Sequence, residues 1–130
     1  MKRHWLLGLF LLLALEARAT APDPVQLVAL KQIFTVGKHQ WFGLAGTGWA
    51  ARVDRIIDSR CPVNAQCLWA GDAQIFLSLG VTNSTKPKHD GLNTVSKTTL
   101  QHRGVTLEVL KLDPGRGVAG PVKLTFRFKR

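Results

Sequence analysis

The C-terminal end of the chain alternates between apolar and polar residues. In the stretch VKLTFRFK, every second side chain from Val122 to Phe128 is apolar, and the residues between them are polar or charged. A period of two is the pattern of a β-strand that buries one face and exposes the other. We therefore expect a strand over 122–129, with Val122, Leu124, Phe126 and Phe128 in a hydrophobic core.

Other parts of the chain repeat this period. It is clear in VTLEVL (105–110) and in AQIFLSLGV (73–81), where Phe76 on the second side predicts burial of both faces, as in a central strand. Weaker versions occur at 38–44, 48–57 and 94–100. The connections are rich in turn-forming residues, notably in KPKHDG (86–91), QHRG (101–104) and DPGRGVAGP (113–121).

The segment 24–36 carries mixed signals. Asp23, Pro24 and Gln26 could begin a helix, whereas the β-branched and aromatic residues of QLVALKQIFTVG favour a strand. We expect a strand, with a helix as the alternative. The total of about seven strands predicts an all-β fold, a small antiparallel β-sandwich or partly closed barrel.

The first nineteen residues have the pattern of a secretory signal peptide. Lys2 and Arg3 precede an apolar run, and Ala17-Arg18-Ala19 is a small-x-small ending, so cleavage is expected after Ala19. The run is about half of the roughly 20 residues that a membrane-spanning helix needs. Removing it leaves 130 − 19 = 111 residues. We expect residues 20–130 to form one domain, periplasmic or extracellular.

The expected mature chain is strongly basic. It keeps 18 − 3 = 15 Lys and Arg residues against 8 − 1 = 7 Asp and Glu residues, a net charge of +8. Such a charge attracts polyanions. An anionic envelope polymer or a protein is therefore an expected partner.

Two cysteines, the only ones in the chain, lie in the stretch DSRCPVNAQCLWAGDA (58–73). In an exported protein an even cysteine count favours a disulfide, here Cys61–Cys67 closing one loop. Trp69 could pack over the disulfide or the open end of the sandwich, and Gly71 permits a bend. A nucleophilic thiol would need a general base nearby, and a zinc site would need two more ligands. The alternative to a purely structural loop is a binding loop with Arg60, Gln66 and Trp69 as contact residues.

The same stretch resembles a motif, DSRCPxxxxCxWAGxA, of small uncharacterised bacterial β proteins that are secreted or lipid-anchored. The resemblance implies an exported β-sandwich-like fold and implies no reaction. It covers these sixteen residues closely, and beyond them only the order of strands. This chain has Ala19-Thr20-Ala21 where a lipid-attachment cysteine would stand.

The last strand suggests a second binding surface. Lys123, Arg127 and Lys129 project from one face of it and could contact a polyanion, with Lys97 and Arg103 on adjoining strands. The aromatic residues of that strand point to the opposite side, so no specific nucleic-acid site is expected.

No catalytic constellation stands out, and neither a cofactor nor a metal is expected. The alternative to a non-enzymatic binding protein is a small metal-binding or hydrolytic protein that uses His89 and His102, which we place in turns, together with Asp90.

Overall fold

The structure is a computed structural model that describes residues 25–81 and 86–130. The expected signal peptide and its cleavage point lie outside these ranges. Nine strands and no helix occur in the described residues, so no helix there could cross a membrane. The strands are β1 (Gln26–Val28), β2 (Ile33–Gly37), β3 (Trp41–Leu44), β4 (Trp49–Asp58), β5 (Ala73–Val81), β6 (Lys88–Asn93), β7 (Thr99–His102), β8 (Val105–Asp113) and β9 (Lys123–Lys129).

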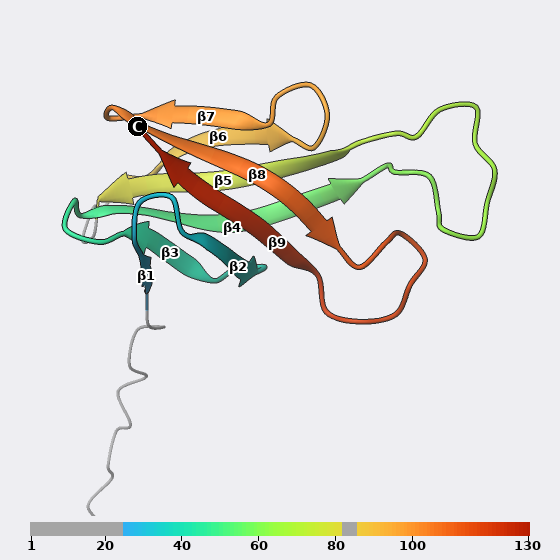
Figure 1. The fold of residues 1–130 in the computed structure, drawn as a ribbon, viewed down its shortest axis with the longest axis horizontal. Coiled ribbons are helices and arrows are strands. Elements are labelled where there is room, and N and C mark those ends of the chain that lie inside the picture. The colour runs from blue at the N-terminus through green and yellow to red at the C-terminus, as the bar shows by residue number, and fades with distance from the viewer. Residues whose placement is uncertain (1–24, 82–85) are drawn as a thin grey trace, which may run out of the picture.

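The strands form two sheets that pack face to face (Figure 1). One has five strands in the order β1-β3-β4-β5-β6, and the other has four in the order β2-β9-β8-β7. All neighbours are antiparallel except β1 and β3, which are parallel. The all-β, partly sandwich-like fold with one disulfide is confirmed.

The core between the sheets is aliphatic and aromatic. Leu124, Phe126 and Phe128 of β9 are buried, as their alternation predicts. Phe42 of β3 stacks on Phe126 with ring centroids 5.2 Å apart, and Phe34 of β2 stacks on Phe128 at 5.5 Å. The first pair joins the two sheets, and the second joins neighbouring strands of the four-stranded sheet. These aromatic contacts therefore stabilise both the packing between the sheets and the pairing within one of them.

The strand expected in the segment 24–36 is confirmed over its described residues, but as two strands, because the chain turns after Val28 and crosses to the other sheet. Two other local expectations were wrong. The expected turn at 86–91 is largely β6, because its residues pair with β5. These two changes raise the count from seven to nine. Residues 94–98 form a connection in place of a strand, and only Thr99 and Leu100 of that segment enter β7.

Two burial expectations also need correction. Val122 is 39% exposed because β9 begins only at Lys123. Phe76 is half-buried rather than covered on both sides, since the five-stranded sheet has a second layer on one face only.

A β-bulge lies in β4 between Val53 and Arg55. Val53 pairs with Leu77 and Arg55 pairs with Phe76, so Asp54 is an extra residue in the ladder. Because of it, Val53 and Ile56 both face the core, while Arg55 faces out.

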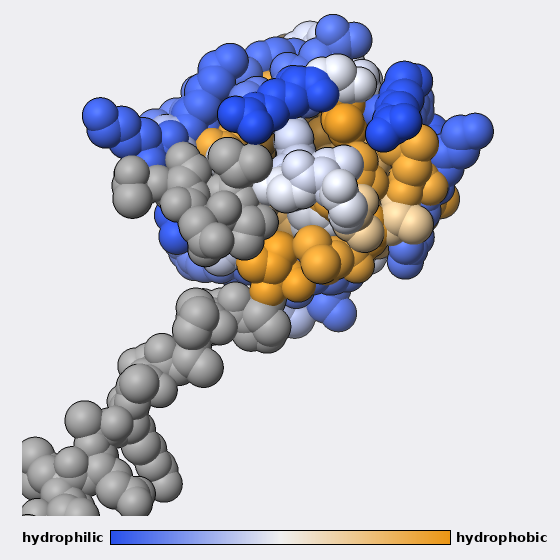
Figure 2. All heavy atoms as spheres, turned by 90° about the vertical axis from the view of Figure 1, so that its left-hand side faces the viewer, coloured by the Kyte–Doolittle hydropathy of each residue, from blue (hydrophilic) through white to orange (hydrophobic). Residues whose placement is uncertain are grey.

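The two longest described loops project from the same end of the sandwich (Figure 1). The loop 59–72 joins β4 to β5, and the loop 114–122 joins β8 to β9 of the other sheet. The opposite end, seen in Figure 2, is hydrophilic along one side and carries a hydrophobic patch along the other.

Candidate functional site

The disulfide Cys61–Cys67 is present, with the two Cα atoms 5.9 Å apart, within the usual range for such bonds. Since the chain has two cysteines, no thiol remains free. The base of the loop is held by ladder-like bonds: the amide of Ser59 donates to the carbonyl of Asp72 (2.8 Å), and that of Cys61 to the carbonyl of Ala70 (2.7 Å).

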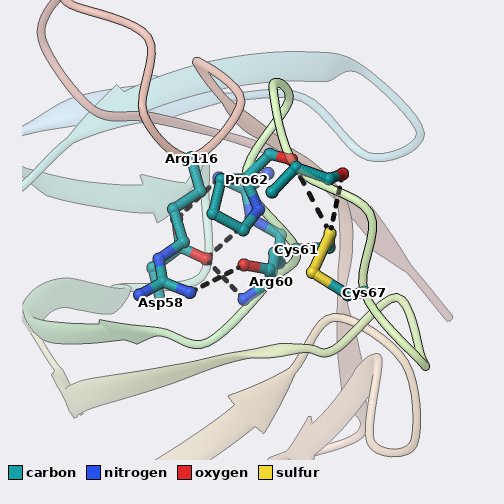
Figure 3. The surroundings of a disulfide bond; sticks show 7 residues. Asp58, Arg60, Cys61, Pro62, Cys67 and Arg116 are labelled. Atoms are coloured by element: carbon teal, nitrogen blue, oxygen red, sulfur yellow. Dashed lines mark hydrogen bonds and ion pairs between the residues drawn. A yellow bond between two sulfur atoms is a disulfide. The ribbon is translucent and has the colours of Figure 1, made fainter.

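Arg60 joins this loop to the other sheet. Figure 3 shows Arg60 and Asp58 at the base of the disulfide loop. Its Nε and Nη2 donate to the two oxygens of Asp58, each at 2.8 Å. Its Nη1 donates to the carbonyl of Leu112 (2.7 Å), and Nη2 donates also to that of Pro114 (2.9 Å). The Arg60 guanidinium, predicted as a contact group, is therefore turned inward and bonded at each of its nitrogens.

The charges of this bridge support each other. The hydrogen bonds from Arg60 lower the pKa of Asp58 despite its partial burial. The same bonds raise the pKa of Arg60. Both groups are thus ionised in the folded protein, and the guanidinium also donates to two backbone carbonyls, those of Leu112 and Pro114.

The two loops also touch directly. Nη1 of Arg116 donates to the carbonyl of Arg60 (3.0 Å), and the amide of Val63 donates to the carbonyl of Arg116 (3.1 Å). A Cβ at Gly115 would lie 2.5 Å from a Val63 methyl group. These contacts give the disulfide loop a fixed position on the end of the sandwich.

Gly71 closes the loop. Its φ is +71°, and a Cβ there would lie 2.2 Å from the carbonyl oxygen of Ser59. Because of this positive φ and close approach, only glycine fits the position.

The far end of the loop is apolar and exposed. Leu68 is fully exposed and Trp69 is 72% exposed, while Val63 and Gln66 are exposed beside them. The expectation that Trp69 packs over the disulfide or the sandwich is wrong. Gln66 and Trp69 are both exposed, whereas Arg60 lies at the base of the loop.

The predicted basic stripe on β9 is partly neutralised. Glu108 of β8 accepts from Arg127 at 2.7 Å and from Lys129 at 2.8 Å, which lowers the pKa of Glu108. Lys97 and Arg103 do not lie on adjoining strands, because both are in connections. The three β9 cations therefore form a weaker anion surface than their sequence spacing indicates.

The two histidines of the hydrolase alternative are in strands, not in turns. His89 lies in β6 and His102 in β7, where its ring centroid is 6.2 Å from that of the buried Trp49. Asp90 pairs with Lys97 at 3.0 Å. Within residues 25–81 and 86–130, no three metal-binding side chains gather.

His89 belongs to a polar network that the sequence reasoning missed. Ser78 donates to Asp54 (2.5 Å), Nε of Arg52 donates to the same carboxylate (2.8 Å), and His89 Nδ1 is 3.3 Å from the Ser78 hydroxyl oxygen. Burial raises the pKa of Asp54, but the bonds from Ser78 and Arg52 outweigh it and the net shift is downward.

This network does not have the geometry of a nucleophilic triad. The Ser78 hydroxyl donates straight to the carboxylate instead of to the imidazole, and Ser78 is 1% exposed. Its members lie on the outer face of β4, β5 and β6. The polar residues Arg52, Asp54 and Ser78, each next to an apolar residue of its strand, are the signal that could have indicated a polar cluster there.

Comparisons with known proteins identify no relative. No protein-family model matches the chain, no curated protein matches it significantly, and no solved structure does so.

Proposed function

We propose that the protein is a non-enzymatic binding or accessory protein of the cell envelope, exported through its N-terminal segment. The disulfide and the lack of a membrane-spanning helix in the described residues are compatible with a periplasmic or extracellular location. The binding surface in this proposal is the apolar end of the disulfide loop, formed by Val63, Leu68 and Trp69.

The observation that carries the proposal is the exposure of Leu68 and Trp69 on a backbone that is fixed from several sides. None of the 18 + 8 = 26 Lys, Arg, Asp and Glu residues of the chain falls between Cys61 and Ala70. Keeping large apolar side chains in water costs free energy that burial against a partner would recover. Tryptophan is also enriched among the residues that dominate binding energy.

The rigidity of the loop supports the same proposal. The disulfide, the Arg60 bridge and Gly71 hold the loop before any partner arrives. A preordered loop loses little conformational entropy on binding, so more of its contact energy becomes affinity.

Photo-crosslinking in cells that produce the protein natively tests this proposal. A photoreactive residue replaces Trp69, and in a matched control it replaces Gln101, which is exposed on β7. We expect one envelope species to be captured from position 69 and not from position 101. The variant Leu68→Ser should lose that species while keeping its unfolding free energy. Identical capture from both positions would refute the proposed surface.

A further inference from the structure

The outer face of the five-stranded sheet carries a second surface, independent of the disulfide loop. We call it the outer sheet face and define it by the side chains that point away from the core on β3 to β6. They include Trp41, Arg52, Asp54, Arg55, Gln74, Phe76, Ser78 and His89. No second layer of the described residues covers it.

Two arginines on this face lie over aromatic rings. The guanidinium carbon of Arg55 lies 4.3 Å from the ring centroid of Phe76, and that of Arg52 lies 5.2 Å from the ring centroid of Trp41. Arg52 also pairs with Asp54. Arg55 has no acidic partner among the described residues, so its edge donors face solvent. A stacked guanidinium with free edge donors suits a carboxylate or phosphate oxygen.

A hollow lies beside Phe76. Its volume is about 210 Å³, and it is lined by residues 74–76 of β5 and 91–93 of β6 together with Lys97. The residue opposite Phe76 on β6 is Gly91, which has no side chain to fill the space. This volume lies below the roughly 300 Å³ at which pockets for drug-sized ligands begin. It suits one ring of a longer chain better than a separate ligand.

Further hydrogen-bonding side chains lie near the hollow and the arginines. Gln74 is exposed at one side, and His89 is exposed at the other. A ligand that combines an oxyanion with hydroxyl groups would use the Arg55 guanidinium and these polar side chains together. These groups on the protein match a sugar acid, which carries both a carboxylate and hydroxyl groups, more closely than they match an anion without hydroxyl groups.

We propose that the outer sheet face binds an acidic polysaccharide, with a carboxylate on Arg55 and a sugar ring in the hollow beside Phe76. The net positive charge of the chain favours the approach of such a polymer. Single-stranded nucleic acid fits less well, because bases need open aromatic faces to stack on. Here Arg52 and Arg55 cover ring faces of Trp41 and Phe76.

The test is a titration of the purified protein with polygalacturonate, a linear polyuronate, at low salt. Neutral dextran and polyphosphate are the comparison polymers. We expect polygalacturonate to bind, dextran not to bind, and polyphosphate to bind at least about tenfold more weakly.

Three variants locate the site. Arg55→Gln removes the guanidinium and should weaken polygalacturonate binding at least about tenfold, the scale of a lost charged hydrogen bond. Arg130→Gln removes the same charge at the exposed C-terminus and should change affinity less than about twofold. Gly91→Val fills the hollow, keeps every charge and should weaken binding at least about fivefold. Urea unfolding of each variant confirms that the fold is kept.

Three results would overturn the proposal. The first is an equal loss of affinity in the two arginine variants, which would mean attraction by net charge alone. The second is polyphosphate binding as tight as polygalacturonate. The third is no binding of polygalacturonate at millimolar uronate.

Discussion

The replacement of Arg60 by lysine tests whether one side chain holds the two sheets together at the loop end. The Arg60 side chain makes four hydrogen bonds, two to Asp58 and two to the carbonyls of Leu112 and Pro114. Lysine keeps the charge, but its single ammonium group cannot span these acceptors. Losing two or three bonds at about 0.5–1.5 kcal/mol each gives an expected destabilisation of about 1–4.5 kcal/mol.

Equilibrium urea unfolding, followed by tryptophan fluorescence with the disulfide intact, measures this loss for Arg60→Lys. The matched control is Arg116→Lys, which removes a single exposed bond to the Arg60 carbonyl and should cost at most about 1 kcal/mol. Amide hydrogen exchange should also accelerate over 114–121, more than fifty positions away in sequence. A loss below about 0.5 kcal/mol, or unchanged exchange over 114–121, would refute the role of Arg60 as the bridge.

Three more outcomes follow from the same loop. Gly71→Ala should destabilise the fold by more than about 3 kcal/mol in urea unfolding, since a positive φ costs roughly 1–2 kcal/mol and the new Cβ meets backbone. The control Gly104→Ala is also at positive φ but has open space around it, so it should lose only the roughly 1–2 kcal/mol that the positive φ costs. Because the pKa of Asp58 is lowered from 3.8 by folding, its contribution is present above about pH 4 and is lost as the pH falls further; Asp58→Asn should flatten the acid limb of a stability–pH curve. Replacing Cys61 and Cys67 by serine should cost about 2.4 kcal/mol of unfolding free energy in the chain-entropy account, and a loss near zero would contradict it.

The sequence predicts the strands whose side chains alternate without interruption. β5, β8 and β9 were placed within a few residues, because one face of each packs in the core. β6 was missed because its KHDG residues have the composition of a turn, and pairing with β5 outweighs that preference. The segment that contains β1 and β2 forms two strands because each half joins a different sheet. The local sequence pattern does not encode that choice of sheet.

The candidate site was only partly predictable. Cysteine count and spacing were enough for the disulfide, but the exposure of Trp69 depends on how the loop lies on the sandwich. The inward position of Arg60 depends on carbonyls more than fifty residues away. The outer sheet face stayed hidden because a bulge interrupts the period of β4, so Val53 and Arg55 point to opposite sides.

That bulge also marks a place where the length of the chain can change without repacking the interior. Asp54 is the extra residue of the ladder, so deleting it would leave Val53 and Ile56 in phase on the core side. A one-residue insertion at this point can add a carboxylate beside Ser78 and His89, and a deletion can remove it. The polar chemistry of the outer face can therefore vary by single-residue gain or loss, while the hydrophobic register on the other side of the strand stays constant.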